Sequence, residues 1–232
     1  PLRLVGSEMC IRDRVILDPE LTIQLPKNLT AWTGIDALVH AIEAYVIDDF
    51  HPLCDGAALE ALRLIYPNLP IVYEKGEDLT SRGKMLVGSC LAGISFLKGL
   101  GFVHAISHMV GAEYDTQHGL TNAIVLPSVL RFNKDGMGSK ISAMSEAMGL
   151  KKNDFDYFYK SICDLLDQFE IPKKLSDIGV KDSSVKSLAK KALKDSAFAT
   201  NPKTATLEEM MELIETSINS VSYTHLTLPT KA

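Results

Sequence analysis

The sequence predicts an all-α domain of packed helices, and three observations carry this prediction. From Leu29 onward, apolar residues recur at helical spacing through nearly every segment. Only residues 15–25 are strand-like, and they contain the turn-forming pair Asp18-Pro19. Strand and helix patterns do not alternate along the chain as they do in α/β domains. The 232 residues, 46% of them hydrophobic, can bury a core for one sizeable domain or two small ones.

The expected helices follow one another with short connections. In chain order they cover residues 33–46, 55–73, 79–96 and 103–114, a short segment after His118, and residues 139–148, 154–169, 182–197 and 206–218. The last three carry apolar residues at i, i+3 and i+4 with Lys and Asp between them, as amphipathic surface helices do. Thr206 is an expected N-cap of the final helix, with Glu209 at capping-box distance.

The two ends of the chain do not continue this pattern. Residues 1–14 (PLRLVGSEMCIRDR) and 221–232 (VSYTHLTLPTKA) lack the apolar period of their neighbours and resemble translated sequencing-adapter strings found in metagenomic assemblies. We expect both to be non-native, which removes Cys10 and His225 from consideration. The expected native part is residues 15–220, a fragment at both ends that forms one helical metal-binding domain.

Composition excludes several classes of partner. The net charge of −5 gives no attraction to nucleic acid or to an anionic membrane. No apolar run reaches the roughly 18 residues that a membrane span requires. The four cysteines form no CxxC pair, so we expect buried or incidental thiols and a cytoplasmic location; they are Cys10, Cys54, Cys90 and Cys163.

The first chemical signal lies on the helix TGIDALVHAIEAYV. Asp36, His40 and Glu43 share one narrow stripe, because positions i, i+4 and i+7 lie on one face of a helix. No Lys or Arg occurs between residues 31 and 47, which predicts a helix buried on all sides. A buried carboxylate beside a buried imidazole needs a partner. From this helix alone, a core hydrogen bond between Asp36 and His40 and a metal site explain the pattern equally well.

A second apolar segment, GLGFVHAISHMVGAEYDTQHG, favours the metal site. His104 and His108 are again four residues apart, on an arc that Gly111 completes, and His118 follows at the start of another helix. No residue between Lys98 and Glu113 carries a fixed charge. Neutral imidazole and carboxylate are ligands that Zn²⁺ and Fe²⁺ accept, and one Asp with two or three His is a common set.

Other classes of enzyme are excluded because their motifs are missing from the sequence or altered in it. HAISH has the spacing of a zincin, but Ala105 stands where that class carries its general-base Glu. No GxSxG, P-loop or GxGxxG occurs, so the chain contains neither a serine-hydrolase nor a self-contained dinucleotide-binding motif.

Three longer stretches carry a specific resemblance. LTAWTGIDALVHAIEAYV, DGAALEALRLI and KGLGFVHAISHMVGAEYDTQHGLTNAIVLP resemble the signature region of the iron-containing (group III) alcohol dehydrogenases, and the wider match extends from about Val15 to about Ser220. In that family an Asp and a His four apart, with two further His, bind Fe²⁺ or sometimes Zn²⁺. By motif position the resemblance assigns these roles to Asp36, His40, His104 and His118. It places His108 close to the nicotinamide of the cofactor.

The resemblance implies a two-domain enzyme of the dehydroquinate synthase-like type, of which only the helical half is here. The missing N-terminal α/β domain would bind NAD or NADP through a glycine-rich turn, so the fragment is expected to be inactive alone. A bacterial homodimer acting on a small alcohol or aldehyde is implied as well. His51-Pro52 and Lys98 depart from the usual pattern, and both departures bear on substrate identity.

The implied mechanism is hydride transfer between an alcohol and the nicotinamide, with the cation acting as Lewis acid. His108 is expected to relay a proton or orient the substrate, with a purely structural role as the alternative. Phe96 and Lys98 are candidates for the substrate pocket, although a surface position suits Lys98 equally. Glu43 either accepts a hydrogen bond from a ligand His or pairs with the missing domain.

Two rival hypotheses remain. Glycerol dehydrogenase and dehydroquinate synthase resemble the same fold and use a related metal site, usually with zinc. A non-catalytic helical metal-binding module is the second rival, and it requires no nucleotide-binding partner.

Overall fold

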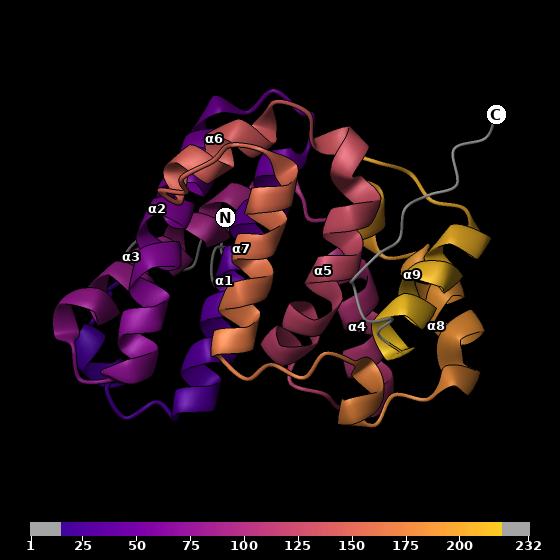
Figure 1. The fold of residues 1–232 in the computed structure, drawn as a ribbon, viewed down its shortest axis with the longest axis horizontal. Coiled ribbons are helices and arrows are strands. Elements are labelled where there is room, and N and C mark those ends of the chain that lie inside the picture. Colours follow the sequence, from indigo (N-terminus) through magenta and orange to yellow (C-terminus); the bar gives the residue numbers. More distant parts are fainter. Residues whose placement is uncertain (1–14, 220–232) are drawn as a thin grey trace, which may run out of the picture.

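The computed structural model describes residues 15–219, and every regular element within them is a helix (Figure 1). The expected all-α architecture is thereby confirmed. The two segments expected to be non-native, residues 1–14 and 221–232, lie outside the described residues.

Nine α-helices and five short 3-10 helices make up residues 15–219. The α-helices are α1 (Lys27–Val46), α2 (Pro52–Glu74), α3 (Leu79–Ser95), α4 (Phe102–Tyr114), α5 (His118–Met137), α6 (Lys140–Ala147), α7 (Phe155–Gln168), α8 (Val185–Ala192) and α9 (Leu207–Asn219). The 3-10 helices are η1 (Pro19–Thr22), η2 (Phe96–Lys98), η3 (Leu175–Ile178), η4 (Asp182–Ser184) and η5 (Ser196–Phe198).

Three expectations about individual elements were wrong. The strand-like segment 15–25 contains η1, because Pro19 begins a turn and the Asp18 side chain accepts a hydrogen bond from the Glu20 amide. The helix after His118 is not short: α5 runs for 20 residues and continues through Pro127. The helix expected over 182–197 divides into η4, α8 and η5, and Asp195 caps the last of these by accepting from the Ala197 amide.

The capping box at the last helix is confirmed. The Glu209 amide donates to Thr206 Oγ1, and Glu209 Oε2 accepts from the Thr206 amide, at 3.2 and 2.8 Å. Two orphan amides at the start of α9 are satisfied in this way. The described cysteines, Cys54, Cys90 and Cys163, are free thiols, whereas Cys10 lies outside the described residues.

Seven of the nine α-helices of the described residues form two groups that meet along α1 and α5. Helices α1, α2 and α3 pack together, while α4, α5, α8 and α9 form the second group on the right of Figure 1. One continuous hydrophobic core runs through both groups, and α1 contributes side chains from opposite faces, including Ile35 on one and Ala37 and Ala41 on the other. Because α1 contacts α2, α3 and α5, it lies inside the molecule and brings its polar stripe to the seam between the two groups.

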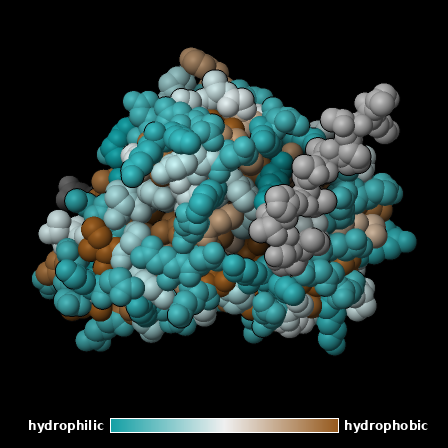
Figure 2. All heavy atoms as spheres, viewed as in Figure 1, coloured by the Kyte–Doolittle hydropathy of each residue, from teal (hydrophilic) through white to brown (hydrophobic). Residues whose placement is uncertain are grey.

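The face drawn in Figure 2 is mostly polar over its described residues, with scattered apolar side chains. Among residues 15–219, no single helix is both long and apolar enough to cross a membrane; one bent pair, Leu79–Lys98 with Phe102–Tyr114, passes by length and composition when taken together.

Candidate metal centre

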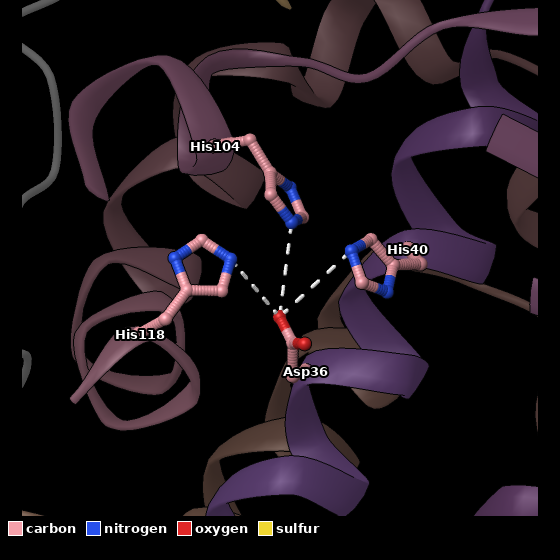
Figure 3. A group of neighbouring side chains, drawn as sticks. All are labelled: Asp36, His40, His104 and His118. Carbon is pink, nitrogen blue, oxygen red and sulfur yellow. Dashed lines mark ion pairs between the residues drawn. The ribbon is translucent and has the colours of Figure 1, made fainter. Parts of the chain in front are cut away.

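Four side chains from three helices converge at the seam between the two groups (Figure 3). Helix α1 provides a carboxylate and an imidazole one turn apart, and α4 and α5 each provide an imidazole from their first turns. One ligand atom from each lies within 4.8 Å of all the others; the residues are Asp36, His40, His104 and His118. The resemblance of the sequence assigned these four residues to one cation, and the structure brings them together.

The separations suit a shared cation. Asp36 Oδ1 lies 3.4 Å from His118 Nε2, 3.7 Å from His104 Nε2 and 3.9 Å from His40 Nε2, as the dashed lines in Figure 3 mark. Ligand atoms about 2.1 Å from one ion in a tetrahedral arrangement lie about 3.4 Å apart. One carboxylate oxygen and three imidazole nitrogens are also a donor set that Fe²⁺ and Zn²⁺ accept. The residues therefore fit a divalent cation in both chemistry and spacing.

The cluster is closed on one side and open on the other. The His104 side chain is 1% exposed, whereas that of His118 is 41% exposed. A catalytic cation needs an open position for substrate, while a structural one is enclosed by protein. The exposure of His118 favours the catalytic type.

Electrostatic surroundings differ among the four residues. Burial alone would lower the pKa of His104, but its contacts with Asp36 and Glu43 outweigh burial and raise that pKa to about 9. Burial lowers the pKa of His40 to about 4, and it lowers the pKa of His118. Burial would raise the pKa of Asp36, yet His104 and the other imidazoles hold it below its usual value. At neutral pH the metal-free cluster is thus Asp36 carboxylate beside charged His104 and two neutral imidazoles.

Glu43 orients the His104 ring by contacting Nδ1, the ring nitrogen that does not face the cluster. Glu43 is 3% exposed as a residue. Its carboxylate accepts from the Gly101 amide at 3.0 Å and from the Val103 amide at 2.7 Å, and its Oε2 lies 2.7 Å from His104 Nδ1. With Nδ1–H held by Glu43, His104 presents Nε2 to the cluster. Of the two roles expected for Glu43, the structure supports the hydrogen-bond acceptor. The same carboxylate satisfies two orphan amides at the start of α4.

The substitution Glu43→Gln is expected to weaken cation binding about 10- to 100-fold, the usual cost of losing such a partner. A carboxamide places an NH₂ group where one of the two carboxylate oxygens now accepts, so the contacts to two backbone amides and to His104 Nδ1 can no longer all be kept. Zn²⁺ titration against a competing chelator measures the loss. Glu113→Gln is the matched control, because Glu113 lies on α4, the helix that carries His104, but pairs with Lys191 at 2.8 Å. Equal affinity in Glu43→Gln and the unaltered chain would contradict the assignment.

A glycine allows α5 to approach α1 closely. A Cβ on Gly119 would lie 2.3 Å from the Trp32 carbonyl oxygen and 3.2 Å from Asp36 Cβ. Since the Trp32 oxygen belongs to the backbone of α1, no side-chain rotation relieves this contact. The absence of a side chain at residue 119 is what permits His118 to reach Asp36.

The substitution Gly119→Ala is expected to destabilise the fold by about 1–3 kcal/mol through overpacking and to lower cation affinity by displacing His118. Urea unfolding and Zn²⁺ titration measure the two effects. Gly83→Ala on α3 is the control: its Cβ meets nothing within 4 Å, so stability should stay equal or rise. Unchanged stability and affinity in Gly119→Ala would rule out the close approach.

His108 lies beside the cluster without joining it. Its ring packs against those of His104 and His118, with centroids 5.7 and 5.6 Å away, and its side chain is 37% exposed. Nδ1 lies 3.0 Å from Asp195 Oδ2, which leaves Nε2 free. Asp195 comes from the break between α8 and η5, a partner that no sequence spacing indicated.

The two pocket candidates lie in different environments. The Phe96 ring is 5.0 Å from that of His40, and the residue is 38% exposed, so it forms part of the open surface beside the cluster. Lys98 is buried, and its Nζ lies 2.5 Å from Asp55 Oδ1. The surface position considered for Lys98 was therefore wrong, because the ammonium pairs with a carboxylate at the start of α2.

Comparisons with known proteins cover most of the described chain. Residues 30–218 match the model of the Fe-containing alcohol dehydrogenase family, C-terminal. The chain is 39% identical over 202 residues to "Probable alcohol dehydrogenase EutG" of Escherichia coli (strain K12), covering 87% of this chain and 51% of the relative. It is 35% identical over 217 residues to an NAD-dependent methanol dehydrogenase of Bacillus methanolicus, covering 88% and 55%.

A solved structure extends the likeness to three dimensions. The crystal structure of a 1,3-propanediol oxidoreductase superposes with a TM-score of 0.83 at 37% identity, over 87% of this chain and 55% of that one. The chain thus spans about half the length of the relatives it matches.

Proposed function

The chain belongs to the iron-containing alcohol dehydrogenase family, and on that premise we propose that it is the metal-binding half of an NAD(P)-linked oxidoreductase that interconverts an alcohol and an aldehyde or ketone. The observation that carries the proposal is the convergence of one carboxylate and three imidazoles at a partly open seam. The names of the relatives refer to alcohols and diols, which favours this reaction over the synthase and over a non-catalytic module.

We assign the cation to the four converging residues: Asp36, His40, His104 and His118. Fe²⁺ is the first choice because of the family, and Zn²⁺ suits the same donors. When bound, the cation would supply Lewis acidity to the oxygen of the alcohol or carbonyl substrate. NAD is the proposed cofactor, with NADP as the alternative, because one relative is named as NAD-dependent.

The chain's own residues supply the proton handling. Asp195 holds the proton of His108 on Nδ1, so that Nε2 carries a lone pair toward its open surroundings. We assign His108 the task of receiving the alcohol proton at Nε2 and returning it in the reverse reaction. We propose that the nicotinamide lies near His108, and the space beside Gly111 supports this, because a Cβ there would meet only the Thr116 carbonyl, at 3.9 Å.

Phe96 is proposed as an apolar wall of the substrate pocket, next to His40. Lys98 would contribute indirectly, because its ammonium is occupied by Asp55. The ion pair fixes η2 against α2 and so positions Phe96. The apolar Phe96 ring would suit the carbon chain of a small alcohol.

The remainder of the enzyme is proposed from the family. An N-terminal nucleotide-binding domain would complete the active site, and the protein would act as a homodimer in the bacterial cytoplasm. The half-length coverage of the relatives is consistent with a missing cofactor domain.

A fusion tests the proposal. Residues 15–219 would replace the matching half of the 1,3-propanediol oxidoreductase, and NADH formation would be followed with methanol, 1-propanol, 1,3-propanediol and glycerol. We expect alcohol-dependent NADH formation that requires added Fe²⁺ or Zn²⁺. A folded, cation-loaded fusion that oxidises none of these alcohols would overturn the proposal.

A further inference from the structure

We infer that Asn122 is a positioning residue of the metal centre, which holds Asp36 and His118 in place by donating both hydrogens of its side-chain amide. The inference rests on the proposed cation site and adds a residue that the sequence did not indicate as part of it.

Asn122 lies directly against the cluster. It is one helical turn after His118 on α5, so the two side chains share a face. The residue is fully buried, and its Nδ2 lies 2.6 Å from Asp36 Oδ1, 3.1 Å from His118 Nε2 and 3.3 Å from His104 Nε2. The amide nitrogen therefore contacts three of the four candidate ligand atoms.

A count of hydrogens shows which contacts the amide can satisfy. The NH₂ group has two hydrogens, and its nearest acceptors are Asp36 Oδ1 and His118 Nε2. The distance of 2.6 Å to Asp36 is short, as expected for a bond to a charged oxygen. His104 Nε2 is the farthest of the three, at 3.3 Å, and receives neither hydrogen of the amide; its ring is held instead by Glu43 through Nδ1.

The other end of the amide points to the same role. Asn122 Oδ1 is buried and has no hydrogen-bond partner among the described residues. A buried polar atom without a partner is unfavourable, so an interaction elsewhere must impose this orientation. Turning the amide over would place its oxygen against the Asp36 carboxylate. The orientation is thus set by the cluster rather than by the core around it.

These contacts have different fates when a cation binds. A carboxylate oxygen has two lone pairs and can accept from Asn122 while it bonds the cation, whereas an imidazole nitrogen has one and must exchange its hydrogen bond for the cation. Asn122 thus holds two ligands toward the seam before loading and continues to hold Asp36 afterwards. Without the amide hydrogens of Asn122, the Asp36 and His118 side chains would be less ordered before the cation binds. Ordering them would then use part of the binding free energy and lower the affinity for the cation.

The test compares two buried asparagines of α5 in the full 232-residue chain. Asn122→Leu removes both donors at similar volume, and Asn133→Leu is the matched control, because Asn133 donates to Asn201 Oδ1 at 2.9 Å, away from the cluster. Zn²⁺ affinity is measured against a competing chelator, and the visible absorption of bound Co²⁺ reports ligand geometry. We expect Asn122→Leu to bind Zn²⁺ about 10- to 100-fold more weakly, with an altered Co²⁺ spectrum. Asn133→Leu should lose thermal stability and keep both the affinity and the spectrum.

Unchanged Zn²⁺ affinity and Co²⁺ spectrum in Asn122→Leu would overturn the inference, as would an equal loss of affinity in Asn133→Leu. If Asn122→Leu does not fold, Asn122→Ser, whose shorter hydroxyl cannot reach both acceptors, takes its place with the same expected loss. Failure of the unaltered chain to bind Zn²⁺ or Co²⁺ would instead count against the proposed cation site. The two failures are therefore distinguishable.

Discussion

The substitution His118→Ala is expected to lower affinity for a divalent cation at least about 100-fold. Four protein ligands share a binding free energy on the order of 10 kcal/mol, and every 1.4 kcal/mol corresponds to about a factor of ten. Among the three imidazoles, His118 has the Nε2 nearest to Asp36 Oδ1, at 3.4 Å, and the most exposed side chain. Its loss would remove one donor while leaving the packed core of the other two helices in place. In the fusion enzyme, NADH formation should fall with cation content.

Elemental analysis after dialysis measures this effect. His51→Ala is the control, because His51 is exposed and only caps α2, with Nδ1 accepting from the Cys54 amide at 3.3 Å. The control should keep one cation per chain. A full complement of cation in His118→Ala would exclude His118 from the ligand set.

Cation affinity is expected to rise about tenfold per pH unit between about pH 7 and pH 9, and to level off above that range. The pKa of metal-free His104 is raised to about 9, so its Nε2 carries a proton throughout this window. The pKa of His40 is lowered to about 4 and that of His118 is also lowered, so both are neutral there. A cation can bind only the unprotonated Nε2 of His104 and must displace one proton. Because a higher pH removes this competing proton, cation affinity rises with pH.

Zn²⁺ titrations at several pH values, repeated in two buffers of different ionisation enthalpy, give the slope and the number of protons released. Glu43→Gln supplies the control. Because the Glu43 carboxylate helps to raise the pKa of His104, its removal should flatten the dependence in this window. A flat profile in the unaltered chain would show that His104 is not charged before loading.

Much of the fold follows from local pattern, and the failures have local causes too. The helical period located α2, α3 and α4 to within a few residues of their observed bounds. It did not predict the length of α5, because Pro127 usually marks a helix end, and here packing keeps the helix continuous through it. The strand expected over 15–25 was wrong because the turn chemistry of Asp18 and Pro19 prevailed over apolar content.

Some residues of the candidate site could likewise be predicted from the sequence, and others could not. Asp36 with His40, and His104 with His108, could be found because each pair shares a helix face four residues apart. Asp195 and Lys98 could not be placed, since their partners depend on how distant helices pack. Asn122 was within reach: it lies four residues after His118, and the same spacing rule applied once more would have singled it out.

The seam position of the cluster has a consequence for folding. An ion bound there joins α1 of one helix group to α4 and α5 of the other, much as a covalent cross-link would. Anything that binds only the native state raises its stability in proportion to the logarithm of ligand concentration. A bound cation would thereby couple its own supply to the resistance of this chain to unfolding. A substitution that loosens the seam would lower both cation affinity and stability without touching a ligand.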